Sequence, residues 1–404
     1  MYESIRKICL DKVTGLDLVS QPLAFWIFDP NAVKRSYDLW KTKLPSVHPH
    51  YAIKCNPLPE LVSLLGKLGC NFDCATITEV QEVLDLGFSP ERCIFAQTFK
   101  PYNEIPAVRD LGVKLVTVDS LYEVEKMAKF APDMDLVVRI RADDVTAGLS
   151  LGDKFGLLEE EIEPVIAKIK EHNLQMVGIA FHVGSDAHSA SAFGDALHAA
   201  RKTYAIAEKY DFHPTLVDIG GGFTQDARFD SFADVIESTI ADLKFPTDVH
   251  FTAEPGRFFG ATSMHLCVGI FGIRERGKHI EYICGDGITG DFACCITGYT
   301  KLEINELREL DGPLHESHFY GPSCNGKDKI GQGMYHRMTP GEDWLLVTNI
   351  GAYSMAKTTH FNGYLYKDFE MIIVDSDLDI SIPEHMTDRR IPAIRGTTAP
   401  KLNF

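Results

Sequence analysis

Three segments of the chain place reactive residues directly after apolar stretches typical of buried strands. Lys54 ends YAIK, a glycine run interrupts VDIGGGF (217–223), and Glu254 ends FTAE. A desolvated lysine can form a Schiff base with a carbonyl, and consecutive backbone N–H groups can close on a phosphate. A carboxylate beside a ring nitrogen would keep that nitrogen protonated. Together these residue types suggest covalent chemistry on a phosphate-bearing cofactor.

Two more segments could complete such a site. In FHVGS (181–185), His182 ends an apolar stretch and could stack on an aromatic ligand, while Ser185 could donate to a phosphate. Arg257 closely follows Glu254 and could add a charge-assisted phosphate contact. Each residue also has an ordinary interpretation: a core histidine, a snorkelling lysine, a tight glycine turn or an exposed ion pair. No one of them decides the function alone.

The elements that would position these residues alternate between strand and helix patterns from about residue 24 to 254. Repeated strand–helix units indicate parallel strands, and their number over this length favours a (β/α)8 barrel, with an open doubly wound sheet as the competing fold. Strands are expected at 24–29, 50–54, 71–75, 93–97, 114–119, 136–141, 176–183, 216–220 and 249–254.

Beyond residue 260 the pattern changes to longer strands separated by Gly, Pro and Asp turns, such as MHLCVGIFGIRER and DWLLVTNIG. Such strands are typical of antiparallel sheets. We therefore expect a β/α barrel over residues 25–260 and a β-rich domain that combines residues 1–24 with 261–404.

Composition narrows the classes of function. The formal net charge of −17 argues against nucleic-acid binding. No apolar run approaches membrane-spanning length and no signal-peptide core is evident, so we expect a cytoplasmic protein without membrane contact. The 10 cysteines lack paired C-x-x-C spacing, which argues against a metal site.

The sequence resembles the ornithine decarboxylase family of fold-type-III PLP enzymes over nearly its whole length. The resemblance is carried by seven motifs in the family's order: YAIKCN, FDCAT followed by Glu79, FHVGS, DIGGGF, AEPGR, GPSCNGKD and GAYS. It implies a PLP-dependent amino-acid decarboxylase that acts as a homodimer with shared active sites. The barrel would bind PLP, and the β-rich domain would contribute a loop to the active site of the partner subunit.

The resemblance also implies roles for individual residues. Lys54 matches the Schiff-base lysine, His182 the ring that stacks on PLP, and Glu254 the partner of the pyridine nitrogen; racemases of this fold type have an arginine there, so Glu254 favours decarboxylation. Cys324 matches a cysteine that protonates the product in the neighbouring subunit, and Lys154 with Asp328 resembles an ion pair between subunits. Further residues match the phosphate cradle or the surroundings of the ring: Asp73, Glu79, Arg139, Ser185, Gly221, Gly222, Arg257 and Tyr353.

The sequence departs from the family at the substrate's far end. Ornithine enzymes hold the distal ammonium between two aspartates, and the matching positions here are Asn325 and Gly298. A buried ammonium without a carboxylate costs several kcal/mol. We therefore expect a substrate that is bulkier than ornithine or carries a modified or N-substituted amine, bound by Gly298, Asn325 and Phe361. Asp291 is the acid that could restore a diamine-type substrate.

Two alternatives remain open at this stage. The chain could be an authentic ornithine or lysine decarboxylase of polyamine synthesis with an altered distal pocket. It could also be a catalytically silent regulatory homologue, although such a protein should have lost the PLP-binding residues that this sequence retains.

Overall fold

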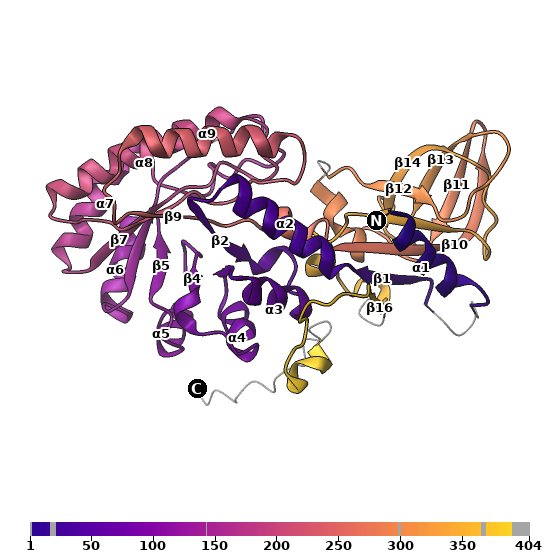
Figure 1. Cartoon of the computed structure of the whole chain (residues 1–404), viewed down its shortest axis with the longest axis horizontal. Coiled ribbons are helices and arrows are strands. Elements are labelled where there is room, and N and C mark those ends of the chain that lie inside the picture. The colour runs from indigo at the N-terminus through magenta and orange to yellow at the C-terminus, as the bar shows by residue number, and fades with distance from the viewer. Residues whose placement is uncertain (1, 17–21, 143, 298–299, 365–368, 390–404) are drawn as a thin grey trace.

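The computed structural model describes residues 2–16, 22–142, 144–297, 300–364 and 369–389. These residues form a closed barrel of parallel strands and, beside it, a mixed β-sheet (Figure 1). The expected β/α barrel with a second β-rich part is thereby confirmed, and the open doubly wound sheet is excluded.

Eight strands close the barrel in chain order, and β2 completes the ring by pairing with both β3 and β9. A helix follows each strand and covers the outside of the barrel. The strands are β2 (Val47–Ala52), β3 (Asn71–Cys74), β4 (Cys93–Phe95), β5 (Leu115–Val118), β6 (Asp135–Arg139), β7 (Gln175–Ala180), β8 (Leu216–Asp218) and β9 (His250–Ala253). The helices are α2 (Pro30–Lys43) before β2, then α3 (Pro59–Leu68), α4 (Ile77–Asp85), α5 (Glu104–Asp110), α6 (Leu121–Phe130), α7 (Glu159–Glu171), α8 (Ala190–Lys209), α9 (Arg228–Leu243) and α10 (Arg257–Gly260).

The barrel helices form where apolar spacing and capping residues agree. Helix α7 buries Ile162, Val165, Ile166 and Ile169, which recur at the three- and four-residue spacing of one helix face. Helix α4 begins after Thr76, whose hydroxyl accepts the N–H of Glu79. A cap of this kind fixes the residue at which the helix begins, and so the length of the connection from the preceding strand.

An aromatic cluster on the outside of the barrel supports the loops of the catalytic end. The ring of Trp40, on α2, lies 5.0 Å from Phe223 and 5.2 Å from Phe258, measured between ring centroids. All three side chains are buried. Phe223 directly follows the glycine run and Phe258 directly follows Arg257, so this packing anchors both segments.

The mixed sheet has the order β12-β15-β10-β11-β13-β14, with β1 attached to β10 and β16 attached to β1. The pairs β11–β13 and β1–β16 are parallel and the others are antiparallel, so the sheet is not purely antiparallel as expected. The strands are β1 (Ala24–Phe28), β10 (Met264–Arg276), β11 (His279–Cys284), β12 (Glu303–Glu306), β13 (His315–Tyr320), β14 (Lys329–Tyr335), β15 (Trp344–Thr348) and β16 (Glu370–Ile373).

The strand at the N-terminal boundary of the barrel lies elsewhere than expected. Strand β1 pairs along its whole length with β10 of the mixed sheet, so residues 25–28 belong to that sheet and not to the barrel. The five residues of β1 are all buried. A short, wholly apolar strand has no polar face that would indicate which of two sheets it joins.

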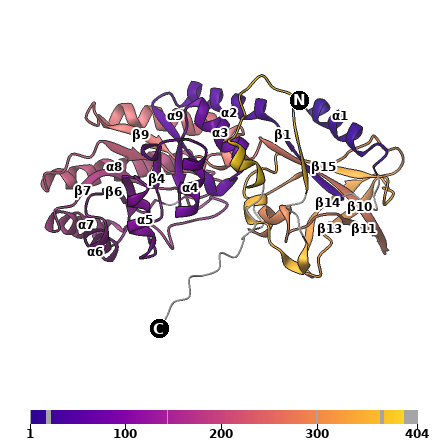
Figure 2. The ribbon, with the colours of Figure 1, turned by 90° about the horizontal axis from the view of Figure 1, so that it is seen from below.

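The N-terminal helix α1 (Tyr2–Val13) packs on the mixed sheet, where Ile5 and Cys9 join Phe25 and Trp344 in a buried cluster. Figures 1 and 2 place this helix beside the mixed sheet and away from the barrel helices. Among the described residues, no helix is both long and apolar enough to cross a membrane.

Candidate active site

Lys54 lies just beyond the strand that was expected to carry it. Strand β2 ends at Ala52, and Lys54 occupies a single 3₁₀ turn, η1 (Ile53–Cys55). Its Nζ forms a hydrogen-bonded ion pair with Oδ2 of Asp73, at the end of β3. Burial by itself would lower the pKa of Lys54, but the negative charges of Asp73 and Glu254 outweigh it and raise the pKa. The amine is therefore held as a cation inside the site.

Two further carboxyls lie deep in the site, at the ends of neighbouring strands. Glu254 follows β9, and Asp218 ends β8. Burial raises the pKa of Glu254 well above its usual range, and the negative charges of Asp218 and Asp73 raise it further. Burial, with the charge of Asp73, also raises the pKa of Asp218, to about 6. The protonated form of Glu254 is therefore favoured near neutral pH, and its carboxyl, which lines the cavity, is available to a basic ring nitrogen.

Asp218 is a functional candidate that the sequence reasoning missed. Its Oδ1 accepts the N–H of Gly220 at 2.8 Å, so it also fixes the start of the glycine run. Its position in the sequence could have identified it. Like Lys54 and Glu254, it is an ionisable residue at or just beyond the end of an apolar strand.

The glycine run leaves room beside His182 that any other residue would fill. A Cβ on Gly221 would lie 2.8 Å from Nε2 of His182 and 2.9 Å from the carbonyl oxygen of Glu254. Gly222 has a φ of +108°, and its Cβ would lie 2.6 Å from the carbonyl oxygen of Gly184. Glycine is therefore required at both positions, and the backbone N–H groups stay open to a ligand.

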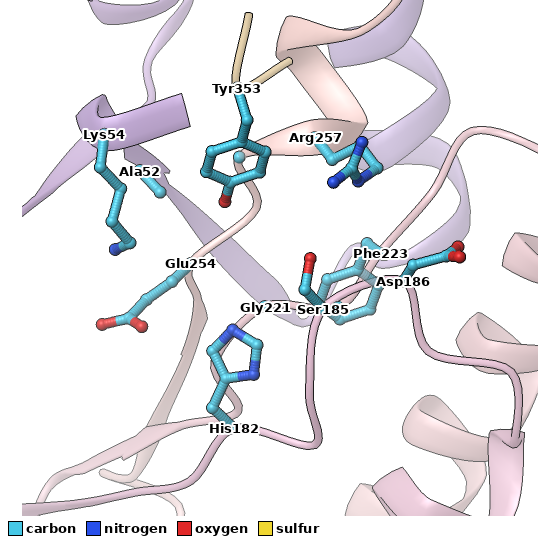
Figure 3. A pocket seen from close by; sticks show the side chains of 12 residues that line it. Ala52, Lys54, His182, Ser185, Asp186, Gly221, Phe223, Glu254, Arg257 and Tyr353 are labelled. Carbon is cyan, nitrogen blue, oxygen red and sulfur yellow. The ribbon is translucent and has the colours of Figure 1, made fainter. Parts of the chain in front are cut away.

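His182 is held as a neutral, flat ring at the floor of the cavity (Figure 3). Its Nδ1 accepts the N–H of Gly184 at 3.0 Å. Burial lowers the pKa of His182 well below its usual range, and the positive charges of Arg139 and Lys54 lower it further. An uncharged imidazole in this position can stack on an aromatic ring without adding a charge beside it.

Ser185, Arg257 and Tyr353 surround the other end of the same cavity. In Figure 3 the Ser185 hydroxyl, the Arg257 guanidinium and the Tyr353 ring converge on the space across from Lys54. The Arg257 guanidinium carbon lies 5.2 Å from the centre of the Tyr353 ring. Lys357, which the sequence reasoning did not select, places its Nζ 5.1 Å from that ring. The Arg257 guanidinium and the Ser185 hydroxyl at this end suit a phosphate.

Tyr353 comes from the β-rich part of the chain, so the cavity is built by both parts. Its backbone N–H donates to the carbonyl oxygen of Cys55 at 2.8 Å, next to Lys54. Its φ of +57° is rare for a residue with a side chain. This conformation turns the phenol towards the glycine loop.

Two expected residues lie at the margin of the site. Arg139, at the end of β6, packs its guanidinium 4.8 Å from the centre of the Phe155 ring. Glu79 accepts the N–H of Ala75 at 2.5 Å and so helps to cap α4; burial raises its pKa. Neither belongs to the described residues that line the cavity, although the charge of Arg139 reaches His182.

The residues expected to come from a partner subunit lie outside the cavity of their own chain. Cys324 is exposed, and the Phe361 side chain is 46% exposed. The N–H of Cys324 donates to Oδ1 of Asn362 at 2.8 Å, which brings the segment of Phe361 beside that of Cys324 and Asn325. The structure thus gathers these three residues at one surface. Gly298 lies outside the described residues.

Two buried aspartates support this surface. Asp328 accepts N–H groups of Ile288 at 2.7 Å and Ser323 at 3.1 Å, which holds the base of the Cys324 loop. Asp291 accepts from Nε1 of Trp26 at 2.8 Å and from the hydroxyl of Thr358 at 2.6 Å. Burial raises the pKa of Asp291 to about 6. Asp291 therefore already serves two donors of its own chain.

The cavity as a whole fits a flat phosphate-bearing aldehyde such as PLP. It offers the Lys54 amine on one side, the buried carboxyl of Glu254 for a ring nitrogen, a neutral imidazole below, and the backbone of the glycine run with Ser185 and Arg257 at the far end. Among the described residues, no group of His, Cys, Asp and Glu could hold a metal ion.

Substitution of one glycine tests this fit. We expect Gly221→Ala to weaken PLP binding by at least about tenfold, because the added methyl would force His182 or the Glu254 backbone away from the cofactor. Titration of the cofactor into the apoenzyme, followed by absorbance, measures this. Gly194→Ala is the matched control, because its Cβ would approach nothing closer than 3.4 Å. Equal affinities for the two variants would contradict the assignment.

Comparisons with known proteins agree with the geometry. A family model described as the pyridoxal-binding domain of pyridoxal-dependent decarboxylases matches residues 31–261. A probable ornithine decarboxylase from Dictyostelium discoideum is 34% identical over 376 residues, covering 87% of this chain and 81% of the relative. Antizyme inhibitor 2 from Xenopus laevis is 34% identical over 361 residues, covering 84% and 79%. The solved arginine decarboxylase of Paramecium bursaria Chlorella virus, bound to agmatine, has a TM-score of 0.87 and 31% identity, covering 91% of this chain and 100% of that one.

Proposed function

Because this chain belongs to the pyridoxal-dependent decarboxylase family, we propose that it decarboxylates a basic L-amino acid bulkier than ornithine or lysine, or with a substituted side-chain nitrogen. The chain is a PLP-dependent amino-acid decarboxylase of the ornithine, arginine and lysine type, which confirms the expected activity and cofactor. The substrate, the roles of the individual residues and a homodimer with shared sites are the proposal.

The observation that carries the substrate proposal is Asn325. The side chain directly after Cys324 is an amide, whose Oδ1 accepts the N–H of Lys327 at 3.0 Å. An amide can accept a hydrogen bond but offers no negative charge to a distal ammonium. Asp291 already accepts two hydrogen bonds within its own chain. Both features favour a substrate whose far end is large or uncharged.

On the cofactor side, each residue has one task. The Lys54 amine would hold the cofactor at its aldehyde carbon until the substrate amine takes its place. His182 would stack on the ring of the cofactor. Ser185, the N–H groups of the glycine run and Arg257 would bind the phosphate, and the buried carboxyl of Glu254 would hold a proton for the ring nitrogen.

On the substrate side, PLP supplies the electron sink that accepts the electron pair left when the bond to the carboxylate breaks. Glu254 would keep the ring nitrogen protonated and so strengthen that sink. Cys324 of the partner subunit then delivers a proton to the substrate's α-carbon. In support, Cys324 is exposed on its own chain, and the described residues lining that chain's cavity do not include it.

Steady-state rates on a panel of amino acids test the substrate proposal. Purified, PLP-loaded protein would be assayed for CO2 release from ornithine, lysine, arginine and several N-substituted basic amino acids. We expect the highest kcat/KM for a bulkier or substituted member. Fast turnover of plain ornithine would contradict the interpretation of Asn325.

Restoring the missing charge is a second test. We expect Asn325→Asp to raise kcat/KM for ornithine relative to the bulkier substrates by roughly 10- to 100-fold, because a hydrogen bond to a charged group contributes about 1.5–3 kcal/mol. The new carboxylate can still accept from Lys327, so the loop should keep its shape. Asn305→Asp, on β12, is the control and should leave the ratio unchanged. An unchanged ratio in Asn325→Asp would mean that this side chain does not face the substrate.

Two alternatives have specific support. The names of relatives such as the Dictyostelium enzyme support an authentic ornithine decarboxylase, which the substrate panel would reveal directly. The similarity to antizyme inhibitor 2 supports a silent regulatory homologue. Retention of Lys54, Glu254 and Cys324 argues against the second alternative, and failure to bind PLP or to release CO2 from any substrate would favour it.

A further inference from the structure

Asp144 joins two loops that are far apart in the sequence. It lies between β6 and α7 and is only 2% exposed. Its Oδ1 accepts the N–H of Thr146 at 2.8 Å and the hydroxyl of Thr146 at 2.5 Å. Its Oδ2 accepts the N–H groups of His188 at 2.7 Å and Ser189 at 2.8 Å. One buried carboxylate thus satisfies four donors, two in each loop.

Backbone hydrogen bonds extend this connection. Leu149 and Ser185 exchange two N–H···O bonds of 3.1 and 2.9 Å, and the N–H of Asp144 donates to the carbonyl oxygen of Val183 at 2.9 Å. On its other side, the N–H of Ala187 donates to the carbonyl oxygen of Gly222 at 3.0 Å. The segment 183–189 is therefore held between two loops. One is the loop that contains Asp144 (144–149, here called the Asp144 loop), and the other is the glycine loop formed by the glycine run of residues 217–223.

This segment is the one that presents Ser185 to the cavity. Asp186 also lines the cavity, but in Figure 3 its carboxylate points away from the centre, where Arg228 holds it at 2.9 Å. A Cβ on Gly184 would lie 2.9 Å from the carbonyl oxygen of Leu149. The Asp144 loop is thus in close contact with the segment next to Ser185.

The charge of Asp144 suits this position. Helix α8 starts at Ala190, and the side chain of its N-cap residue, Ser189, makes no capping hydrogen bond. Asp144 supplies a negative charge just before this N-terminus, where the helix dipole favours it. Burial would raise the pKa of Asp144, but the hydrogen bonds from Thr146, Ser189 and His188 outweigh it and lower the pKa. The carboxylate is therefore ionised at neutral pH.

We propose that Asp144 is a positioning residue that preforms the cofactor's phosphate site by fixing segment 183–189, with Ser185, against the glycine loop. Asp144 itself touches neither cofactor nor substrate. Its contribution is to hold the site in the binding conformation before the phosphate arrives, so that ordering these loops costs no binding energy. The inference rests on the proposed phosphate-binding role of Ser185.

The test is Asp144→Ala, studied as the full-length apoenzyme and as the PLP-loaded protein. We expect the Kd for PLP to rise roughly 10- to 100-fold, because the N–H groups of His188 and Ser189 lose their charged acceptor and segment 183–189 loosens. The amides of His188 and Ser189 should exchange faster with deuterium in the apoenzyme. The 31P resonance of bound PLP should also shift, because the phosphate surroundings change.

Thr146→Val is the matched control. It removes one donor to Oδ1 but leaves both contacts of Oδ2 with segment 183–189. We expect its Kd for PLP to stay within about twofold of the wild-type value. If Asp144→Ala does not fold, Asp144→Asn, which keeps one acceptor oxygen, should show the same changes to a smaller degree.

Ser185→Ala separates this inference from the proposed function. If Ser185→Ala weakens PLP binding and shifts the 31P resonance while Asp144→Ala changes only the melting temperature, Asp144 is merely structural and the inference is overturned. If Ser185→Ala changes neither quantity, the proposed phosphate site is itself misplaced.

Discussion

Replacement of Lys54 by alanine should lower kcat by on the order of 10³-fold or more, as expected when the covalent partner of the chemistry is lost. Asp73 and Glu254 would then face the cavity without the cation that they now surround. Because unpaired buried carboxylates take up protons, the variant should still fold. CO2 release under saturating substrate and cofactor measures the loss.

A chemical label distinguishes loss of the covalent partner from a general disturbance of the site. Borohydride reduction should attach the cofactor irreversibly to the peptide that contains Lys54 in the wild type and to no peptide in the variant, as read by mass spectrometry. Lys67→Ala is the control: Lys67 forms an exposed ion pair with Asp379, and its removal should change neither activity nor labelling. Label on any other lysine of the wild type would contradict the assignment.

Replacement of Cys324 by alanine should lower kcat by about 10²- to 10⁴-fold, the usual contribution of a positioned proton donor. A more specific prediction concerns mixtures of two variant chains that exchange subunits. If Cys324 acts in the partner's cavity, a hybrid dimer of one Lys54→Ala chain and one Cys324→Ala chain has one intact site. Random reassortment makes half of the dimers hybrid, so an equal mixture should recover about a quarter of wild-type activity.

Controls on dimer assembly show whether any activity recovered in the mixture comes from hybrid dimers. Differently tagged chains allow the hybrid to be counted by native mass spectrometry. Lys54→Ala mixed with a chain carrying both substitutions should stay inactive, because neither subunit then supplies Lys54. Hybrid dimers that form but show no activity would mean that Cys324 serves its own chain, or no chain.

Local patterns were enough to predict the barrel and to place several candidate site residues at the ends of its strands. Lys54, His182 and Glu254 each follow an apolar strand, and the carboxyl ends of parallel strands meet on one face of a barrel, so their sequence positions imply proximity. The glycine run by itself could equally have been a tight turn, and its position after a late barrel strand was what favoured a phosphate site. The resemblance to a family then connected these residues to one cofactor.

Other features depend on partners that lie far away in the chain. The pairing of β1 with β10, the hydrogen bonds that Asp144 accepts from His188 and Ser189, and the raised pKa of Glu254 follow from contacts between distant segments. A wholly buried strand, or an aspartate in a loop, looks the same in the sequence whichever partner it takes. The sequence alone therefore determined which residues are available for the chemistry and at which strand ends they lie. The tertiary structure decided which loops hold them in place, and which carboxyls stay protonated, because burial and neighbouring charge exist only in the folded chain.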